Sequence, residues 1–471
     1  MTMLLDRSIK ELHAGLEGGE FTSEDLVNEC YINIERHQKE LNAFITIIPK
    51  EEVLKAAREK DATMKGATSL LHGVPFVLKD CYATKGVRTT CASAVLGDFV
   101  PPYDATVYRK LIDAGAILIG KMNMDAWGHG GSTENTDFGP TKNPWDTTRV
   151  AGGSSGGPAV AIAARMAAFA IGEDTGGSIR NPSAWCNTTG LKATYGRVSR
   201  YGSIAYASSF DSVGPMAKTA EDCAVVLETI AGRDPLDATS SPAPVPDYTK
   251  RLAIDLTGMV VGVPKEAFGE GLDGEIAAAI RAGIAEFEKM GITVKEVSMP
   301  MLAYAIPIYY LIGPSETSSN LARYDGVRYG EGRDRFTEET MRRVMIGTYA
   351  LSAGYYDQFY KKAQKARTLL VREYKKAFTS CDFIAMPVTP TPPPKVGELV
   401  SNPLQNLLAD IYTVSQNPVG VPSLALPVGF STGDLPIGMQ IVGKMFSEEL
   451  LLSIGHAFQA RTDFHKRKPD L

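Results

Sequence analysis

The sequence has little of what metal-binding, disulfide-rich and nucleic-acid-binding proteins usually show. Its 471 residues include only six histidines, and its six cysteines form no CxxC pair, so no zinc signature can be assembled. Lysine and arginine number 49 against 54 aspartates and glutamates, which leaves a formal net charge of −5 and no basic excess. We therefore expect reduced thiols, no bound metal and no direct binding of nucleic acid.

Long apolar segments are also lacking. The longest such run, Pro158 to Gly172, is interrupted by Arg165 and is too short to span a bilayer. At the start of the sequence, MTMLLDRSIKEL, Asp6 comes too early for a signal peptide and the basic-then-apolar order is missing. These absences predict a soluble cytoplasmic protein without membrane contact, although an organellar form whose presequence had been removed would look the same.

What is present is an alternation of apolar runs and helical patterns. Ser8 with Glu11, and Thr22 with Asp25, have the spacing of capping boxes that open helices. Helical periodicity recurs over 104–114 and 220–231. Short apolar runs typical of buried strands occupy residues 74–78, 116–119, 259–263 and 384–387. The pattern predicts an α/β fold in which helices pack over a mostly buried sheet.

The chain offers few candidates for domain boundaries. The two proline-rich stretches, 240–246 and 387–395, each return at once to patterned sequence, so we predict surface loops there. We expect residues 1–471 to form a single domain. Helical patterning dominates about 304–378, which we interpret as a cap over a site built elsewhere.

The densest glycine-serine segment lies between residues 151 and 178. It contains Gly152-Gly153-Ser154-Ser155-Gly156-Gly157 and Asp174-Thr175-Gly176-Gly177-Ser178. Such runs are typical of loops whose backbone N–H groups approach a ligand closely. The phosphate-binding pattern GxxxxGK[ST] is missing, which argues against ATP binding here. Between the two loops, the apolar run 160–171 is predicted to form a tightly packed helix.

An alternative interpretation is the nucleophile elbow of α/β-hydrolases. Residues 152–156 fit the pattern G-x-S-x-G, His129-Gly130-Gly131 could supply an oxyanion motif, and Asp463 or His465 a triad partner. An elbow should directly follow a buried strand, however, and residues 145–150 are polar. We therefore favour this alternative less.

The scarcity of histidine raises the question of which residue could act as the base for a serine nucleophile. Lys79 is a candidate because it ends the apolar run 73–78. A lysine at the end of a buried strand is desolvated, and desolvation favours the neutral amine that can accept a proton. The alternative is a lysine whose ammonium group extends to solvent.

Taken together, these motifs resemble the amidase signature family. Lys79, the loop 152–157 and the run 174–180 (DTGGSIR) occur in the family's order, and the resemblance continues through 191–199 and 207–211 over essentially the whole chain. It implies a large mixed β-sheet with helices on both faces.

The resemblance also implies roles for individual residues. Ser178 matches the nucleophile, Ser154 the bridging serine with a cis peptide bond, and Lys79 the terminal base. Backbone N–H groups of Thr175, Gly176 and Gly177 would form the oxyanion hole, whose preorganised donors stabilise a tetrahedral intermediate.

Within this family, four stretches resemble the A subunits of tRNA-dependent amidotransferases: 318–330, 346–356, 360–367 and 435–440. In those subunits an arginine and an aspartate hold the zwitterionic end of free glutamine, and the matching positions are Arg343 and Asp410. Arginine suits a carboxylate and aspartate an ammonium group. The neighbouring Arg342 is a rival for Arg343. The further candidates for the pocket are Gly131, Ser132 and Tyr309 or Tyr310.

This resemblance implies a glutaminase that passes ammonia to partners. A B subunit would bind tRNA, ATP and Mg²⁺ and amidate Glu-tRNA(Gln) or Asp-tRNA(Asn), and a small C subunit would wrap the interface. No cofactor is expected in this chain. The alternatives are a stand-alone amidase acting on another small amide and a non-catalytic scaffold.

The sequence departs from the family pattern in several places. Glu173 precedes Asp174 where a small or hydroxyl residue is typical, and we expect its carboxylate to point away from the oxyanion hole. The segment between Gly330 and Arg342 is shorter than usual in the A subunits. Pro158 follows the glycine loop, where it suits the first turn of a helix.

Overall fold

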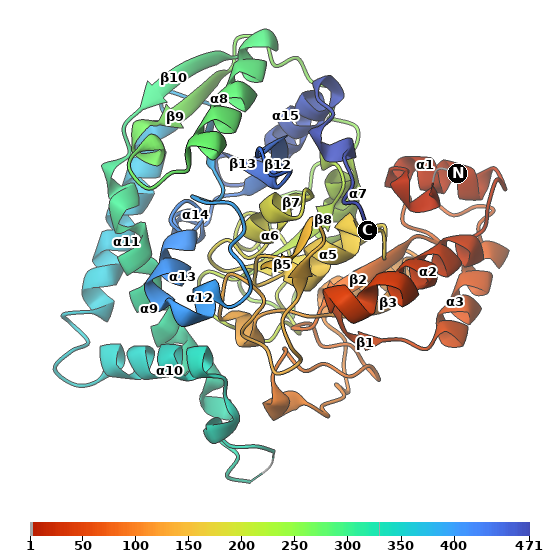
Figure 1. Ribbon diagram of the computed structural model, residues 1–471, viewed down its shortest axis with the longest axis horizontal. Coiled ribbons are helices and arrows are strands. Elements are labelled where there is room, and N and C mark those ends of the chain that lie inside the picture. The colour runs from red at the N-terminus through yellow and green to blue at the C-terminus, as the bar shows by residue number, and fades with distance from the viewer. Residues whose placement is uncertain (1–2, 329) are drawn as a thin grey trace.

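A large sheet runs through the protein. The computed structural model describes residues 3–328 and 330–471, so that Met1, Thr2 and Tyr329, which belong to stretches quoted above, lie outside the described residues. Eleven strands form one sheet in the order β1-β3-β2-β6-β8-β7-β12-β13-β11-β9-β10, and β4 and β5 form a separate two-stranded sheet. The large sheet extends from β1 at the lower right to β10 at the upper left (Figure 1).

The strands and helices are spread along the whole chain. The strands are β1 (Phe44–Ile47), β2 (Pro75–Lys79), β3 (Ile117–Met122), β4 (Lys142–Asn143), β5 (Asp146–Val150), β6 (Phe169–Asp174), β7 (Thr189–Lys192), β8 (Ser212–Ala217), β9 (Val260–Pro264), β10 (Thr293–Val297), β11 (Phe383–Pro387), β12 (Ser423–Phe430) and β13 (Pro436–Val442). The helices are α1 (Ile9–Glu17), α2 (Ser23–Leu41), α3 (Lys50–Ala62), α4 (Thr106–Asp113), α5 (Gly156–Ala163), α6 (Arg180–Trp185), α7 (Ala220–Ile230), α8 (Gly274–Lys289), α9 (Ala305–Asn320), α10 (Glu338–Leu351), α11 (Tyr360–Ala377), α12 (Glu398–Ser401), α13 (Pro403–Ala409), α14 (Gln416–Val419) and α15 (Glu448–Arg461).

The strand directions are mixed, which confirms the predicted mixed α/β fold. Strand β2 runs parallel to both β3 and β6, whereas β6 runs antiparallel to β8. Helix α5 packs against β2 and β6, and α6 packs against β7, β12 and β13. Because β2 and β6 are parallel neighbours, their carboxyl ends meet at one edge of the sheet. Lys79 at the end of β2 therefore lies beside Glu173 and Asp174 at the end of β6.

The local signals read from the sequence are confirmed. Ser8 with Glu11 and Thr22 with Asp25 both form complete capping boxes, at the starts of α1 and α2. Each of the four apolar runs predicted as strands coincides with a strand to within a few residues, namely β2, β3, β9 and β11.

One predicted helix is wrong in its extent. We expected helix over 160–171, but α5 ends at Ala163 and the chain re-enters the sheet as β6 at Phe169. Arg165 has a φ of 56°, in the left-handed region, and the chain turns there. Since every residue of α5 and β6 is buried, the sequence carries no polar periodicity that separates the helix from the strand.

The region 304–378 contains α9, α10 and α11 and, in its described residues, no strand. Helix α9 packs against both α10 and α11. At the lower left of Figure 1, α10 lies below the other two helices. In the described part of the chain, none of the helices has the length and apolar character needed to cross a bilayer.

Candidate active site

Lys79 and Ser154 form a hydrogen-bonded pair inside the protein. Lys79 Nζ donates to Ser154 Oγ at 2.7 Å and to the Glu173 carbonyl oxygen at 3.3 Å. Both side chains are buried, so the lysine does not extend to solvent. The Gly153–Ser154 peptide bond is cis, as the family resemblance implied. The amine and hydroxyl thus have the contact that proton transfer between them requires.

The loops that carry Ser154 and Ser178 are tied together by their backbones. The Ser155 N–H donates to the Ser178 carbonyl oxygen at 3.0 Å, and Ser155 Oγ donates to the Glu173 carbonyl oxygen at 3.1 Å. On its other side the Ser154 loop approaches Asp125, because a Cβ on Gly153 would lie 2.1 Å from Asp125 Oδ2. Glycine is therefore needed where this loop passes the carboxylate.

The loop before Ser178 presents free backbone donors. Within the described residues, the N–H groups of Thr175, Gly176 and Ser178 have no hydrogen-bond acceptor. The Gly177 N–H, by contrast, donates to Asp174 Oδ1 at 2.9 Å. Of the three N–H groups that the resemblance implies for the oxyanion hole, those of Thr175 and Gly176 are available in this geometry and that of Gly177 is not. The Ser178 N–H is a further available donor that sequence reasoning missed, because which N–H groups are free depends on the fold of the loop.

Sequence reasoning also missed the support beneath this loop. Asp174 and Arg180 form a fully buried ion pair, with Arg180 Nη2 and Nε each 3.0 Å from the carboxylate. Asn417 donates to Asp174 at 3.0 Å. Although burial alone would raise the pKa of Asp174, Arg180 and the other donors hold it well below its ordinary value. Asp174 is therefore a permanent anion that fixes the loop.

The expected orientation of Glu173 is wrong. Its side chain is only 2% exposed, and Oε2 lies 3.7 Å from Lys79 Nζ. Ser203 Oγ donates to the other carboxylate oxygen at 3.0 Å. Glu173 points inward because alternate residues of β6 face opposite sides of a sheet that is buried on both sides. A carboxylate thus lies directly beside the lysine amine.

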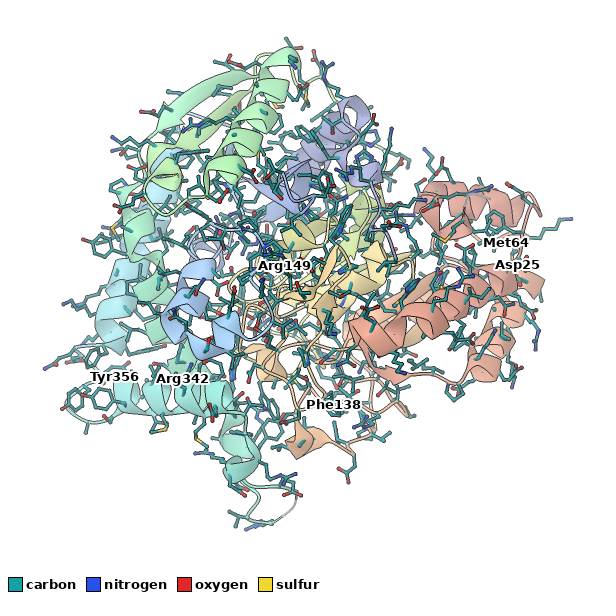
Figure 2. The ribbon with its side chains drawn as sticks, in the orientation of Figure 1. Asp25, Met64, Phe138, Arg149, Arg342 and Tyr356 are labelled. Atoms are coloured by element: carbon teal, nitrogen blue, oxygen red, sulfur yellow. The ribbon has the colours of Figure 1, made fainter. Side chains whose placement is uncertain are left out.

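The structure distinguishes Arg343 from Arg342. Arg343 is 3% exposed, whereas Arg342, labelled in Figure 2, is 41% exposed. Arg343 Nη1 donates to the Tyr206 hydroxyl at 2.7 Å, and Nε donates to Glu339 Oε1 at 2.8 Å. Of the two adjacent arginines, only Arg343 points into the protein interior.

Asp410 lies in the same interior region. The Tyr310 hydroxyl donates to Asp410 Oδ2 at 3.1 Å, and the Arg343 guanidinium lies 5.2 Å from the centre of the Tyr310 ring. Burial raises the pKa of Asp410 to about 7, although the Arg343 charge opposes that rise. A Cβ on Gly131 would lie 3.4 Å from Asp410 Oδ1. Gly131, a candidate for the same pocket in the sequence, therefore lies beside this carboxyl group.

Tyr309 connects this charged pocket to the loop of free N–H groups. A Cβ on Gly176 would lie 2.6 Å from Tyr309 Cζ, so the ring covers the loop at close range. Tyr309 and Tyr310 are neighbours on α9, with ring centres 4.9 Å apart. The Ser132 N–H lies against the Ser154 loop, 2.7 Å from the place that a Cβ on Gly153 would take.

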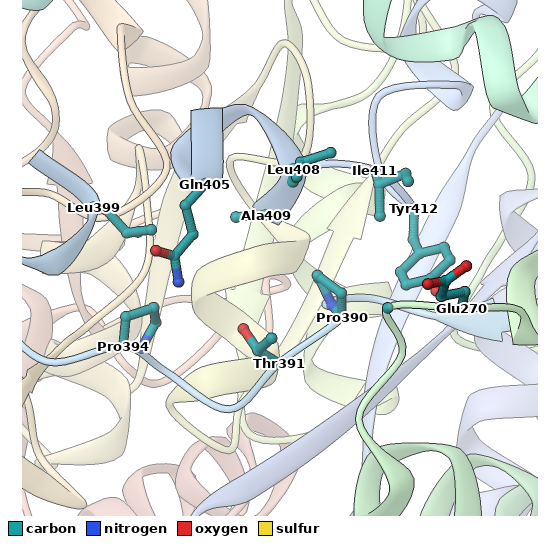
Figure 3. A pocket seen from close by; sticks show the side chains of 11 residues that line it. Glu270, Pro390, Thr391, Pro394, Leu399, Gln405, Leu408, Ala409, Ile411 and Tyr412 are labelled. Atoms are coloured by element: carbon teal, nitrogen blue, oxygen red, sulfur yellow. The ribbon is translucent and has the colours of Figure 1, made fainter. Parts of the chain in front are cut away.

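Two cavities flank this region. One, of about 250 Å³, is lined by Gly130, Ser132, Glu339, Asn406 and other residues, among them Arg342 but not Arg343. The second, of about 260 Å³, lies between α13 and the loop that contains Pro390 and Thr391 (Figure 3). Ala409 and Ile411 line the second cavity. Asp410 and Arg343 line neither cavity, whereas Ser132 lines the first, so the first cavity is the one that reaches a residue expected at the site.

The alternative hydrolase triad is not assembled. Asp463 is 82% exposed and pairs with Lys466, and His129 is held by Thr317 and Thr340. The segment before the glycine loop does form a strand, β5, but β5 is partly exposed and lies outside the large sheet, paired with β4 and bridged to Lys395. The buried strand that a nucleophile elbow needs is absent from this described segment.

Comparisons with known proteins agree with this geometry. The amidase family model matches residues 25–452. The chain is 49% identical to the A subunit of glutamyl-tRNA(Gln) amidotransferase from Desulfatibacillum aliphaticivorans, over 99% of this chain and 100% of that protein.

Solved structures give the same result. The A subunit of glutamyl-tRNA(Gln) amidotransferase from Thermotoga maritima matches with a TM-score of 0.84 and 35% identity, over 100% of this chain and 98% of that one. The peptide amidase of Stenotrophomonas maltophilia matches with a TM-score of 0.82 and 29% identity, over 98% of each chain. On sequence and structure alike, the chain belongs to the amidase family.

Proposed function

We propose that this chain is the glutaminase subunit of a tRNA-dependent amidotransferase. It hydrolyses free glutamine to glutamate and ammonia, and a partner uses the ammonia to amidate Glu-tRNA(Gln) or Asp-tRNA(Asn). The observation that carries the proposal is the buried Lys79–Ser154 hydrogen bond beside the Ser178 loop, with Arg343 and Asp410 linked to that loop through Tyr309 and Tyr310. The extensive identity to the A subunits of glutamyl-tRNA(Gln) amidotransferases supports the same function.

The chemistry proceeds through an acyl-serine. Ser178 Oγ attacks the carboxamide carbon of glutamine while its proton passes to Ser154 Oγ, and the Ser154 proton passes to neutral Lys79 Nζ. The N–H groups of Thr175, Gly176 and Ser178 stabilise the oxyanion. When the C–N bond breaks, the proton returns through Ser154 to the departing nitrogen, and ammonia leaves. Water then hydrolyses the γ-glutamyl ester of Ser178.

The charged pocket suits the other end of glutamine. Arg343 uses Nη1 and Nε to bind Tyr206 and Glu339, and in the described residues its Nη2 has no acceptor, so Nη2 is available to the α-carboxylate. Asp410 Oδ1 faces Gly131 and accepts no hydrogen bond from a described residue, so it can receive the α-ammonium group. Tyr309, between this pocket and Gly176, sets the distance from the charged end to the amide.

The partners follow from the same proposal. A B subunit binds tRNA, ATP and Mg²⁺ and performs the amidation, and a small C subunit completes a heterotrimer in the cytoplasm. This chain itself needs no cofactor, because the proposed hydrolysis uses only serine, lysine and water. The net charge of −5 agrees with tRNA binding by a partner.

The test is ammonia release from free glutamine by the chain copurified with its partners. Wild type releases ammonia and Ser178→Ala does not, while tRNA amidation with added ammonium chloride survives the substitution. Loss of both activities together would contradict the division of labour.

Arg343→Met raises the KM for glutamine at least tenfold, by about 1.4 kcal/mol or more of lost binding, whereas Arg342→Met leaves it near the wild-type value.

The second candidate function is a stand-alone amidase, which the similarity to a peptide amidase favours. Such an enzyme cleaves simple amides without a partner and does not depend on Arg343 or Asp410. If glutamine is untouched while simple amides are cleaved, the acyl-serine chemistry stands and the glutamine assignment fails.

A further inference from the structure

Glu173 has no role in the chemistry described so far. It lies at the end of β6 with its side chain buried, and Oε2 is 3.7 Å from Lys79 Nζ. Its backbone carbonyl also accepts hydrogen bonds from Lys79 Nζ at 3.3 Å and from Ser155 Oγ at 3.1 Å. One residue thus contacts the lysine amine through both its backbone and its side chain.

The carboxylate is held in place from the other side. Ser203 Oγ donates to Glu173 Oε1 at 3.0 Å, which leaves Oε2 for the lysine. Ser203 belongs to the lining of a polar cavity of about 240 Å³ that also includes Asp211 and Arg200. This arrangement is a fixed buried ion pair, because neither partner can rotate to solvent.

Other ionisable groups face this pair from the neighbouring elements. They are Asp80, Lys121, Asp211, Asp125, Arg200, Cys81, Cys91 and Tyr82, of which Lys121 and Asp80 form their own buried ion pair at 3.1 Å. Burial, and then the Glu173 charge, raise the pKa of Asp211 to about 8, and burial raises the pKa of Asp125 to about 7. Burial likewise raises the pKa of both thiols and of the Tyr82 phenol. Among the described residues, Glu173 is the carboxylate that lies within 4 Å of Lys79 Nζ.

We infer that Glu173 is a positioning residue that holds Lys79 against Ser154 and sets the pH at which the proton relay becomes active. A carboxylate beside an ammonium group stabilises the protonated form, whereas the relay needs the neutral amine. Glu173 therefore shifts the onset of acylation to higher pH than a neutral residue at this position would give. The inference rests on the proposed role of Lys79, Ser154 and Ser178.

The test uses a fluorophosphonate, which reacts with an activated serine and needs no glutamine pocket. Ser178 Oγ bonds to phosphorus, the P–F bond breaks, fluoride leaves, and the Ser178 proton passes through Ser154 to Lys79. The rate of labelling of the full chain with its copurified partners is measured from pH 5 to pH 10. Glu173→Gln moves the rising limb of this profile to lower pH by about one unit or more, and Glu173→Asp moves it less.

Glu448→Gln is the matched control. Glu448 is also buried, accepts a hydrogen bond from the Thr194 N–H at 2.7 Å and lies 3.9 Å from Arg197, but does not contact Lys79. Its substitution tests the general cost of losing a buried carboxylate and leaves the rising limb in place. Asp211→Asn tests whether the neighbouring Asp211 carboxyl group causes the shift. We expect the rising limb of this variant to stay at its wild-type pH. If Glu173→Gln does not fold, Glu173→Ser removes the same charge with a smaller polar side chain.

The possible outcomes distinguish a failure of the inference about Glu173 from a failure of the proposed function. A folded Glu173→Gln or Glu173→Ser protein with an unchanged rising limb overturns the role of Glu173 and leaves the proposed nucleophile intact. If wild type is not labelled at any pH, or Ser178→Ala is labelled equally well, the proposed function itself fails.

Discussion

At the scale of single residues, the proposed glutamine pocket depends on a carboxyl group whose charge is finely balanced. Asp410 is surrounded by Tyr310, Gly131 and, further off, Arg343. Burial raises its pKa to about 7, so that the group is mostly charged above neutrality and mostly protonated below it. Only the charged form attracts an ammonium group.

This balance predicts a pH-dependent KM. As the pH falls through about 7, Asp410 gains a proton and loses its attraction for the α-ammonium group, so the KM for glutamine rises roughly tenfold. The measurement is steady-state ammonia release between pH 5.5 and pH 8.5. Asp410→Asn gives a high KM at every pH, and a primary amide without an amino group serves as the control substrate. An equal pH dependence of KM in Asp410→Asn would contradict the assignment.

At the scale of secondary structure, one glycine of α10 lies directly against the backbone of α9. A Cβ on Gly347 of α10 would lie 1.8 Å from the carbonyl oxygen of Pro314 in α9. Helix α10 carries Arg343, and α9 carries Tyr309 and Tyr310. The distance between the helices, and with it the shape of the proposed pocket, is fixed by this backbone contact, since backbone atoms cannot move aside as a side chain can.

Gly347→Ala therefore forces α9 and α10 apart. We expect the KM for glutamine to rise about tenfold because Arg343 moves relative to the two tyrosines, while fluorophosphonate labelling of Ser178 stays within about twofold of wild type. Gly274→Ala is the matched control, since a Cβ at that helix position meets nothing within 4 Å. An equal loss of labelling and of glutamine binding would show that α9 and α10 also shape the surroundings of the proposed nucleophile.

At the scale of the whole molecule, one buried arginine joins distant parts of the chain. Arg180 binds Asp174 near Ser178, the proposed nucleophile, and also Gln416, Asn417 and Gln440, which lie 236 to 260 residues further along the sequence. Every atom of this cluster is shielded from water. The cluster thus connects the Ser178 loop to α14 and β13.

Removing this arginine should destabilise the fold. Arg180→Met leaves the buried Asp174 charge unpaired, at a cost of about 3–5 kcal/mol. The measurement is the free energy of unfolding in denaturant, or the thermal midpoint if unfolding is not two-state. The double variant Asp174→Asn with Arg180→Met should lose less than Arg180→Met alone, because no unpaired charge remains. A double variant that is less stable than the single one would contradict this account.

Much of the architecture could be predicted from local patterns. The strands β2, β3, β9 and β11 stand out as apolar runs, and the capping boxes of α1 and α2 satisfy the first N–H groups of their own helices. Where both helix and strand are buried on every side, as in α5 and β6, the pattern gives no boundary and the prediction was wrong.

The sequence by itself determined the fold class, the family and the order of Lys79, Ser154 and Ser178, because strand ends, glycine loops and motif order are properties of neighbouring residues. Only the tertiary structure decided that Arg343 rather than Arg342 faces inward, and that Glu173 points at Lys79. The sequence does not show which of two neighbouring polar side chains on a helix or strand points inward. That direction is set by the distant segments packed against the element. Because those segments exclude water, each buried charge can interact only with the groups that they bring next to it.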